Sequence, residues 1–198
     1  SDLTVTVGTD SRLSGDSIKE AFIRGANEAG ANVVDCGLAS TPAMFMTTVS
    51  APLMAAAAVM VTASHLPFNR NGLKFFTPKG GLDGKDISAI LDIAERGDFD
   101  TPRSEGCRAT FDFMTAYSHH LARYIRDGVG SDDYLHPLAG MHIIVDAGNG
   151  NGGFFEKVLR SLGAETTGSQ FLNPDGHFPN HIPNPENADA MASVCKAV

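Results

Sequence analysis

Three side chains that could take part in group transfer lie close together around a tight turn. Ser64, His65 and Lys74 contribute a hydroxyl, an imidazole and an amine. A hydroxyl can carry a covalently bound group, and an imidazole or an amine can move protons. The small residues Thr62 and Ala63 leave room for a bulky ligand to approach. The pattern therefore indicates a nucleophile, although a serine in a loop is more often a simple turn former.

Two short predicted strands flank this turn. Residues 59–61 are apolar and partly β-branched, as in a buried strand, and Pro67 stops that strand from continuing. Asn71 and Gly72 form a turn dipeptide, and residues 73–76 return as a second strand. The serine therefore follows the end of a strand, where α/β proteins usually place their chemistry.

A second polar loop, residues 8–15, follows a predicted strand over residues 3–7 and contains Arg12. A predicted helix and a strand over 31–36 come next, which gives a strand–helix–strand unit with a parallel pair. In such a sheet Arg12 would lie on the same edge as Ser64. A planar guanidinium matches phosphate oxygens, although an arginine in a polar loop is more often a solvated surface residue.

Both loops resemble motifs of the α-D-phosphohexomutases, which comprise phosphoglucomutases, phosphomannomutases and phosphoglucosamine mutases. Thr-Ala-Ser-His-x-Pro at 62–67, with Asn-Gly-x-Lys at 71–74, is similar to the family's phosphoserine signature. Leu66 departs from that signature, because the family usually has asparagine there. Gly-x-Asp-x-Arg-x-Ser-Gly at 8–15 is similar to a second family motif.

The resemblance implies an intramolecular phosphotransferase that interconverts hexose 1-phosphate and hexose 6-phosphate through a hexose 1,6-bisphosphate. Ser64 would carry the phosphoryl group and Lys74 would shuttle the proton, while Arg12 and His65 would donate to the phosphoryl oxygens. Mg²⁺ would bind the phosphoryl group on Ser64, with its remaining ligands outside this chain. Nothing in the sequence chooses among glucose, mannose and glucosamine phosphates.

The predicted elements define an α/β fold with a mixed, largely parallel sheet layered between helices. We predict a first domain over residues 1–128, closed by a long helix over 110–127, and a linker over 129–140. Residues 141–198 would begin a second α/β domain with a strand over 141–145. The resemblance covers nearly the whole chain but less than half of the family's length, so we expect a fragment that is inactive by itself.

The glycine-rich turn over residues 146–153 allows two interpretations. Gly148, Gly150 and Gly153 match the dinucleotide pattern G-x-G-x-x-G, but no strand ending in an acidic residue follows at the expected distance. The alternative is a tight packing turn. Asp-Ala-Gly-Asn-Gly-x-Gly also resembles the start of the second phosphohexomutase domain.

Composition limits the class of partner. The formal net charge of −8 and the lack of a basic cluster argue against nucleic acid or an anionic membrane surface. No apolar run reaches membrane-spanning length, and Cys36, Cys107 and Cys195 lack metal-type spacing. We therefore expect a reducing, cytoplasmic location. His177 and His181 lie in a proline-rich segment and receive no metal.

Two other functions remain compatible with the serine. A serine hydrolase would need an imidazole to reach the hydroxyl, which the neighbours Ser64 and His65 rarely allow on a turn, and no Gly-x-Ser-x-Gly elbow is present. A non-catalytic phosphoprotein or binding module that retains the mutase fold would need no proton shuttle. A test of turnover without Lys74 separates this last function from a mutase.

Overall fold

The computed structural model describes residues 3–102 and 104–198, which form two compact units. The first unit comprises the described residues up to Thr9, together with Ser14–Thr62 and Gly72–Phe113. The second unit comprises Asp10–Leu13, Ala63–Asn71 and Met114–Val198. The loops that hold Arg12 and Ser64 therefore group with the C-terminal part of the chain.

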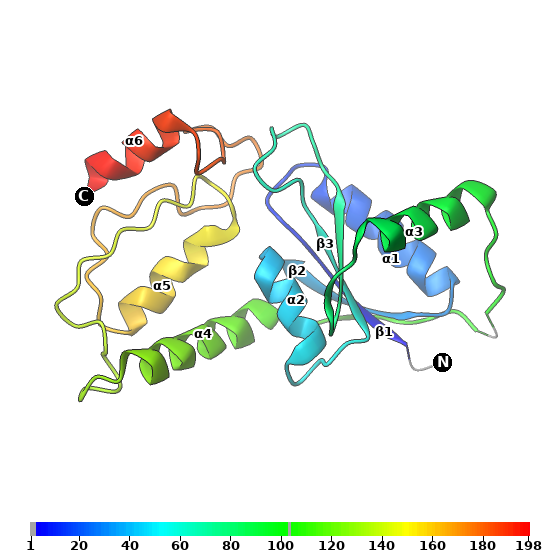
Figure 1. The fold of residues 1–198 in the computed structure, drawn as a ribbon, viewed down its shortest axis with the longest axis horizontal. Helices are drawn as coiled ribbons and strands as arrows, with labels where there is room; N and C mark the ends of the chain where they lie inside the picture. Colours follow the sequence, from blue (N-terminus) through cyan, green and yellow to red (C-terminus); the bar gives the residue numbers. More distant parts are fainter. Residues whose placement is uncertain (1–2, 103) are drawn as a thin grey trace. The chain divides into compact units, whose positions relative to one another are not determined.

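A mixed sheet forms the centre of the first unit (Figure 1), and its described part is six-stranded with the order β5-β4-β3-β1-β2-β6. β1 pairs in parallel with β2 and β3, and β2 pairs in parallel with β6, whereas β4 runs antiparallel to β3 and β5. The predicted mixed, largely parallel sheet is confirmed. The strands are β1 (Thr4–Thr9), β2 (Asn32–Leu38), β3 (Ala57–Val61), β4 (Leu73–Thr77), β5 (Gly80–Gly81) and β6 (Arg108–Thr110).

Side-chain alternation along β1 places two helices on opposite faces of the sheet (Figure 1). Val5 and Val7 lie in a core cluster against which Phe22 of the first helix packs. The intervening Thr6 faces the second helix, where its hydroxyl lies 2.5 Å from that of Thr47. The helices of this unit are α1 (Gly15–Glu28), α2 (Thr41–Val49) and α3 (Gly84–Arg96).

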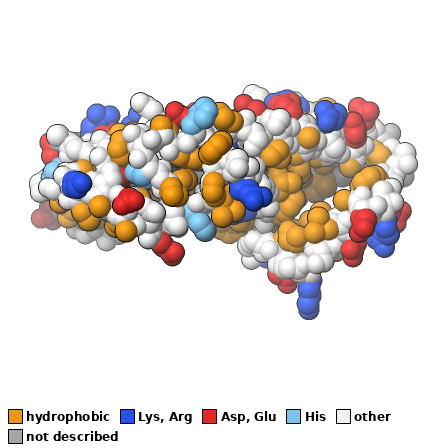
Figure 2. All heavy atoms as spheres, turned by 90° about the horizontal axis from the view of Figure 1, so that it is seen from above, with side chains coloured by type: hydrophobic (Ala, Val, Ile, Leu, Met, Phe, Trp, Pro, Cys, Tyr) orange, Lys and Arg blue, Asp and Glu red, His pale blue; other side chains and the backbone are white. Residues whose placement is uncertain are grey.

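Helix α3 is well capped, but none of its described residues is buried. The Asp83 side chain accepts from two backbone N–H groups at the start of the helix, and Gly97 ends it in a left-handed conformation. Leu91 and Ile93 leave 62% and 43% of their surface exposed. Figure 2 shows hydrophobic side chains lining a hollow in the region where Figure 1 draws α3.

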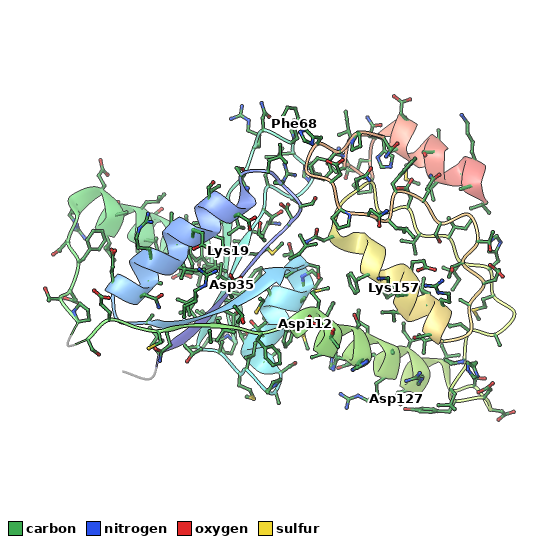
Figure 3. The ribbon with its side chains drawn as sticks, turned by 180° about the vertical axis from the view of Figure 1, so that it is seen from behind. Lys19, Asp35, Phe68, Asp112, Asp127 and Lys157 are labelled. Carbon is green, nitrogen blue, oxygen red and sulfur yellow. The ribbon has the colours of Figure 1, made fainter. Side chains whose placement is uncertain are left out.

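Asp35 joins β2 to two other elements of the first unit. Its carboxylate lies 3.3 Å from Lys19 Nζ on α1, the pair labelled in Figure 3, and 2.6 Å from Arg108 Nη2 on β6. Burial raises the pKa of Asp35, but the Gly37 N–H, Arg108 and Lys19 lower it by more, so the carboxyl has a pKa below its ordinary value. These bonds fix the edge of the sheet to α1.

The second unit has its own core. The residues of this core show that the boundary between the two units differs from the predicted domain boundary. The helices of this unit are α4 (Phe113–Val129), which starts at the junction, α5 (Phe154–Ser161) and α6 (Ala188–Ala197). Ala122 of α4 shares a buried cluster with Val158 of α5 and with Leu138. The long helix assigned to the first domain therefore packs with the second unit, and the predicted linker over 129–140 supplies a core residue.

The strand predicted over 141–145 is wrong as a regular element. Only isolated bridges join this described segment to its neighbour, His142 with Glu165 and Asp146 with Gln170. Gly168, at φ 94°, turns the partner segment between these bridges. The Val145 N–H therefore donates to the Ser169 hydroxyl at 3.0 Å rather than to a ladder carbonyl.

Candidate functional site

Ser64 is an exposed residue with an unusual backbone conformation. The parallel register of β1 and β3 pairs Thr9 with Val61, so the loops after both strands start at the same edge of the sheet. Val61 to Ala63 are buried, whereas Ser64 is exposed. Its φ of 58° is left-handed, a sparsely populated region for a residue with a Cβ. Such strain persists only where the surrounding structure holds it, and it is typical of functional loops.

Arg12 holds the serine loop from inside the second unit. The exposed fraction of its side chain is 0%, and Nε donates to Asp10 Oδ2 at 3.0 Å. The remaining donors all bond to backbone carbonyls of one loop, which are those of Ser64 (2.7 Å), Leu66 (2.8 Å), Pro67 (2.6 Å) and Arg70 (3.1 Å).

This arrangement changes the role that we assign to Arg12. A guanidinium has five N–H donors, and here each of them already has an acceptor. Arg12 could donate to a phosphoryl oxygen only by releasing a loop carbonyl or Asp10. The structure therefore brings Arg12 and Ser64 together. Arg12 positions the serine loop, and Ser64 is a residue of the loop that is positioned.

A cavity of about 350 Å³ opens beside Ser64 within the second unit. Both of the acidic residues that line it, Asp10 and Asp146, are engaged by other groups. Asp10 bonds to Arg12, and Asp146 accepts from Gln170 Nε2 at 2.8 Å and from a ring nitrogen of a histidine. The cavity is therefore acidic by composition, but its carboxylates already have donors.

The histidine is His181, to which the sequence analysis assigned no role. Nε2 lies 3.0 Å from Asp146 Oδ1, and Nδ1 lies 2.9 Å from the Ile182 carbonyl. Because both partners only accept hydrogen bonds, both bonds form together only when the ring is doubly protonated. Burial lowers the pKa of His181, but the Ile182 carbonyl and Asp146 raise it by more, so this pKa lies above its ordinary value of 6.5.

The other two predicted residues have simpler surroundings. His65 is exposed, beside Ser64 in the sequence. Lys74 is half-buried in β4, opposite Met60 of β3 in the antiparallel register. Lys74 belongs to the first unit and Ser64 to the second. The assignment of Lys74 as the proton shuttle therefore stays a prediction.

The glycine-rich turn packs tightly and does not present a phosphate cradle. The N–H groups of residues 148–150 all donate to acceptors of this chain, at 2.9, 2.9 and 2.7 Å. A Cβ at Gly153 would lie 1.9 Å from the Leu172 carbonyl oxygen, so only glycine allows this approach. The second of the two interpretations, a packing turn, agrees with these contacts.

The described residues hold neither a cluster of metal-ligating side chains nor a helix suited to span a membrane. Within residues 3–102 and 104–198, no group of three or more His, Cys, Asp or Glu side chains is arranged to hold a metal ion. None of the helices in the same residues combines the length and apolar character needed to cross a membrane.

The fold and the site define a class: a mixed α/β protein with a left-handed serine after a strand and a buried arginine behind it. Residues 1–101 match the family model for phosphoglucomutase/phosphomannomutase, alpha/beta/alpha domain I. Residues 115–198 match the model for alpha/beta/alpha domain II of the same family. The chain belongs to the phosphoglucomutase/phosphomannomutase family, which confirms the resemblance seen in the motifs.

Individual relatives agree with this assignment. The chain is 31% identical over 195 residues to a phosphoglucomutase from Neisseria gonorrhoeae, covering 98% of this chain and 40% of that protein. It is 36% identical over 184 residues to a probable phosphoglucosamine mutase from Methanopyrus kandleri, covering 92% and 39%. A solved phosphoglucomutase/phosphomannomutase family protein from Burkholderia thailandensis superposes with a TM-score of 0.82 at 28% identity, covering 97% and 41%. The chain thus spans about 40% of the length of these proteins.

Proposed function

We propose that the protein containing this chain is a phosphohexomutase that moves a phosphoryl group between C1 and C6 of a hexose through a phosphoserine at position 64. The observation that carries the proposal is the Ser64 turn: an exposed, left-handed serine whose carbonyl is held by the buried Arg12. Family membership supports this chemistry over other uses of a loop serine.

The proposed reaction is a pair of transfers. In the first, the bond between phosphorus and Ser64 Oγ breaks while a bond forms to a free sugar hydroxyl, which gives a hexose 1,6-bisphosphate. Lys74 accepts the hydroxyl proton. The bisphosphate then turns around. In the second transfer, the bond between its other phosphorus and the sugar oxygen breaks while a bond forms to Ser64 Oγ, and Lys74 gives its proton to that sugar oxygen. Such transfers depend on positioning and on neutralising the phosphoryl oxygens.

Hydrogen-bond donors for this step have to come from groups other than Arg12. A phosphoserine adds a charge of about −1.5 to −2 at neutral pH, and the donors of Arg12 already hold the loop. His65, exposed beside Ser64, is the donor that we assign to the phosphoryl oxygens, and Lys74 keeps its separate role as the proton shuttle.

Enzymes of this family generally depend on Mg²⁺. The described residues do not form such a site by themselves, because the carboxylates of Asp10 and Asp146 beside Ser64 are bonded to Arg12 and His181. Mg²⁺ prefers an octahedral set of oxygen ligands. We therefore assign this chain one ligand, a phosphoryl oxygen on Ser64, and the bound ion would neutralise that oxygen.

The substrate class that we propose is a hexose phosphate. The relatives carry different names, phosphoglucomutase and phosphoglucosamine mutase, so they do not select one sugar. Assays of the full-length protein with the 1-phosphates of glucose, mannose and glucosamine would rank these sugars by kcat/KM.

The test of the proposed function is turnover of the full-length protein with and without the Ser64 hydroxyl. Ser64→Ala should lower kcat by at least about 10⁴-fold, since losing the nucleophile of a covalent mechanism removes most of the catalysis. Ser104→Ala, at another exposed serine, is the matched control and should keep wild-type turnover. Isomerisation by Ser64→Ala at a wild-type rate would contradict the proposal, and a phosphorylated wild type without turnover would favour the non-catalytic phosphoprotein.

A further inference from the structure

Asn149 connects the motif loop of Arg12 to a distant part of the second unit. It is 8% exposed and has a left-handed φ of 60°. Its Nδ2 donates to the Asn173 carbonyl at 2.9 Å, and its Oδ1 accepts from Asn180 Nδ2 at 2.7 Å. Its own carbonyl accepts from Ser11 Oγ at 3.2 Å and from the Asp175 N–H at 2.8 Å. One buried amide thus ties both ends of residues 173–181, here called the 173–181 loop, to the residue before Arg12.

The 173–181 loop in turn packs directly on Arg12 and the serine loop. The Arg12 Cζ lies 5.2 Å from the centroid of the Phe178 ring. A Cβ at Gly176 would lie 2.3 Å from the Ser11 carbonyl oxygen, so the two backbones touch where glycine allows it. Phe68, labelled at the tip of the serine loop in Figure 3, lies 6.5 Å from the His177 ring.

The Phe178 ring contacts a part of the Arg12 guanidinium that the hydrogen bonds leave free, its flat face. The five N–H groups lie in the guanidinium plane and bond to Asp10 and the loop carbonyls, which leaves the flat faces for stacking. An aromatic ring within about 6 Å stabilises such a cation, and the effect is larger when the cation is shielded from water. Arg12 is fully shielded, so Phe178 contributes to holding it in place.

We propose that Phe178 and Asn149 are positioning residues for phosphoryl transfer at Ser64. Asn149 fixes the 173–181 loop, Phe178 of that loop holds Arg12, and Arg12 holds the Ser64 carbonyl. The glycine-rich motif that resembles a nucleotide turn thereby serves the nucleophile. This inference rests on the proposed function.

A double-mutant cycle in the full-length protein tests whether Phe178 acts through Arg12. Phe178→Leu keeps an apolar side chain but loses the ring face, and Arg12→Lys keeps the charge but loses the planar fork. Each single variant should lower kcat on the order of tenfold with little change in KM. The double variant should be close to the worse single variant, because both changes break one linkage. If the loss in kcat of the double variant equals the product of the losses of the two single variants, the two residues act independently and the inference is overturned.

The control for the cycle is Phe99→Leu. Phe99 is 69% exposed in the first unit. Phe99→Leu should leave kcat unchanged. The double variant Phe99→Leu with Arg12→Lys should therefore have the same kcat as Arg12→Lys alone.

Hydrogen exchange gives a second readout that needs no turnover. In the full-length protein, Phe178→Leu and Asn149→Asp should speed exchange of the Leu66 and Arg70 N–H groups, which bond within the serine loop. Asn149→Asp places a carboxylate oxygen against the Asn173 carbonyl where a donor stood. If either variant fails to fold, Asn180→Ala removes a single exposed partner of Asn149 and should have the same effect more weakly.

The two readouts separate this inference from the proposed function. Faster exchange of the serine loop in a protein without mutase turnover would support the positioning linkage and count against the proposed function. Mutase turnover with unchanged exchange in the variants would overturn the positioning linkage and leave the proposed function standing.

Discussion

Ser64 and Arg12 have different roles in the candidate site. Ser64 is an exposed residue with a left-handed backbone, and Arg12 keeps that backbone in place with bonds to loop carbonyls. Planar, rigid donors suit this task because they reach several carbonyls from one side chain. Arg12 therefore holds Ser64 through its main chain.

The first prediction concerns the stability that Arg12 provides. Arg12→Met should lower the free energy of unfolding by about 2–4 kcal/mol, because it leaves Asp10 and the loop carbonyls without their donor. Urea titration measures the change. Arg24→Met, at an exposed position of α1, is the matched control and should stay within about 0.5 kcal/mol of wild type. A loss as small as that of the control would show that Arg12 does not hold the loop.

The second prediction concerns the proton shuttle. Lys74→Met keeps the length and apolar stem of the side chain but cannot accept a proton, so kcat of the full-length protein should fall by about 10²–10⁴-fold. Ser64 should still become phosphorylated in this variant. Lys79→Met, at an exposed turn position, provides the control. A change of only a few-fold would mean that Lys74 is a half-buried strand residue with no part in the proton transfer.

Residue types and spacing drew attention to Ser64 but not to the way in which its loop is held. Ser64 stands out because a strand pattern stops at small residues and a hydroxyl. The role of Arg12 depends on the directions of carbonyls 52 to 58 positions away, and no local pattern encodes those directions. Phe178 and Asn149 were missed for the same reason, since their partners are Arg12, Ser11 and other residues distant in sequence.

Among the elements, those that follow a regular period were predicted well. The sheet strands alternate side chains or form short apolar runs, and the predicted strands over 3–7, 31–36, 59–61 and 73–76 all fall on strands of the sheet. The segment over 141–145 has the same composition but meets a partner that turns at Gly168. A regular strand needs a partner segment that is also extended. The composition of residues 141–145 does not reveal the conformation of their partner segment.

The third prediction concerns the pH-dependent stability that His181 contributes. The raised pKa of His181 means that the folded state binds its proton more tightly than the unfolded state does. The stabilisation is therefore fully present below about pH 6.5, the ordinary value, and is lost as the pH rises through the higher pKa of the folded state. The bonds lost are those to Asp146 and the Ile182 carbonyl.

Urea unfolding of wild type and His181→Asn at several pH values measures this effect. The difference in unfolding free energy between the two proteins should be largest below pH 6.5 and should shrink as the pH rises. A difference that stays constant from acidic to alkaline pH would contradict a protonated His181 in the folded state.

In the whole molecule, the chain corresponds to part of a larger family architecture. The family models for domains I and II match residues 1–101 and 115–198, and the chain spans about 40% of the Neisseria gonorrhoeae phosphoglucomutase. Helix α4 contributes to the core of the second unit, which periodicity alone did not reveal because an amphipathic helix can pack on either side of a boundary.

The fourth prediction is that the 198-residue chain alone does not catalyse isomerisation. The carboxylates beside Ser64 are bonded to Arg12 and His181, so the described residues leave Mg²⁺ with the phosphoryl group on Ser64 as its ligand. A single oxygen binds Mg²⁺ weakly. A coupled assay with a hexose 1-phosphate and excess Mg²⁺ measures the rate, with the full-length protein as the positive control. Magnesium-dependent turnover by the chain alone would refute this prediction.

The location of the phosphoryl group tests the central claim most directly. The full-length protein would be incubated with a hexose 1,6-bisphosphate, and the product examined by intact mass and by peptide mapping. We predict one added phosphoryl group, located on Ser64, and no added group in Ser64→Ala. A phosphoryl group on another residue, with Ser64 unmodified, would contradict the account.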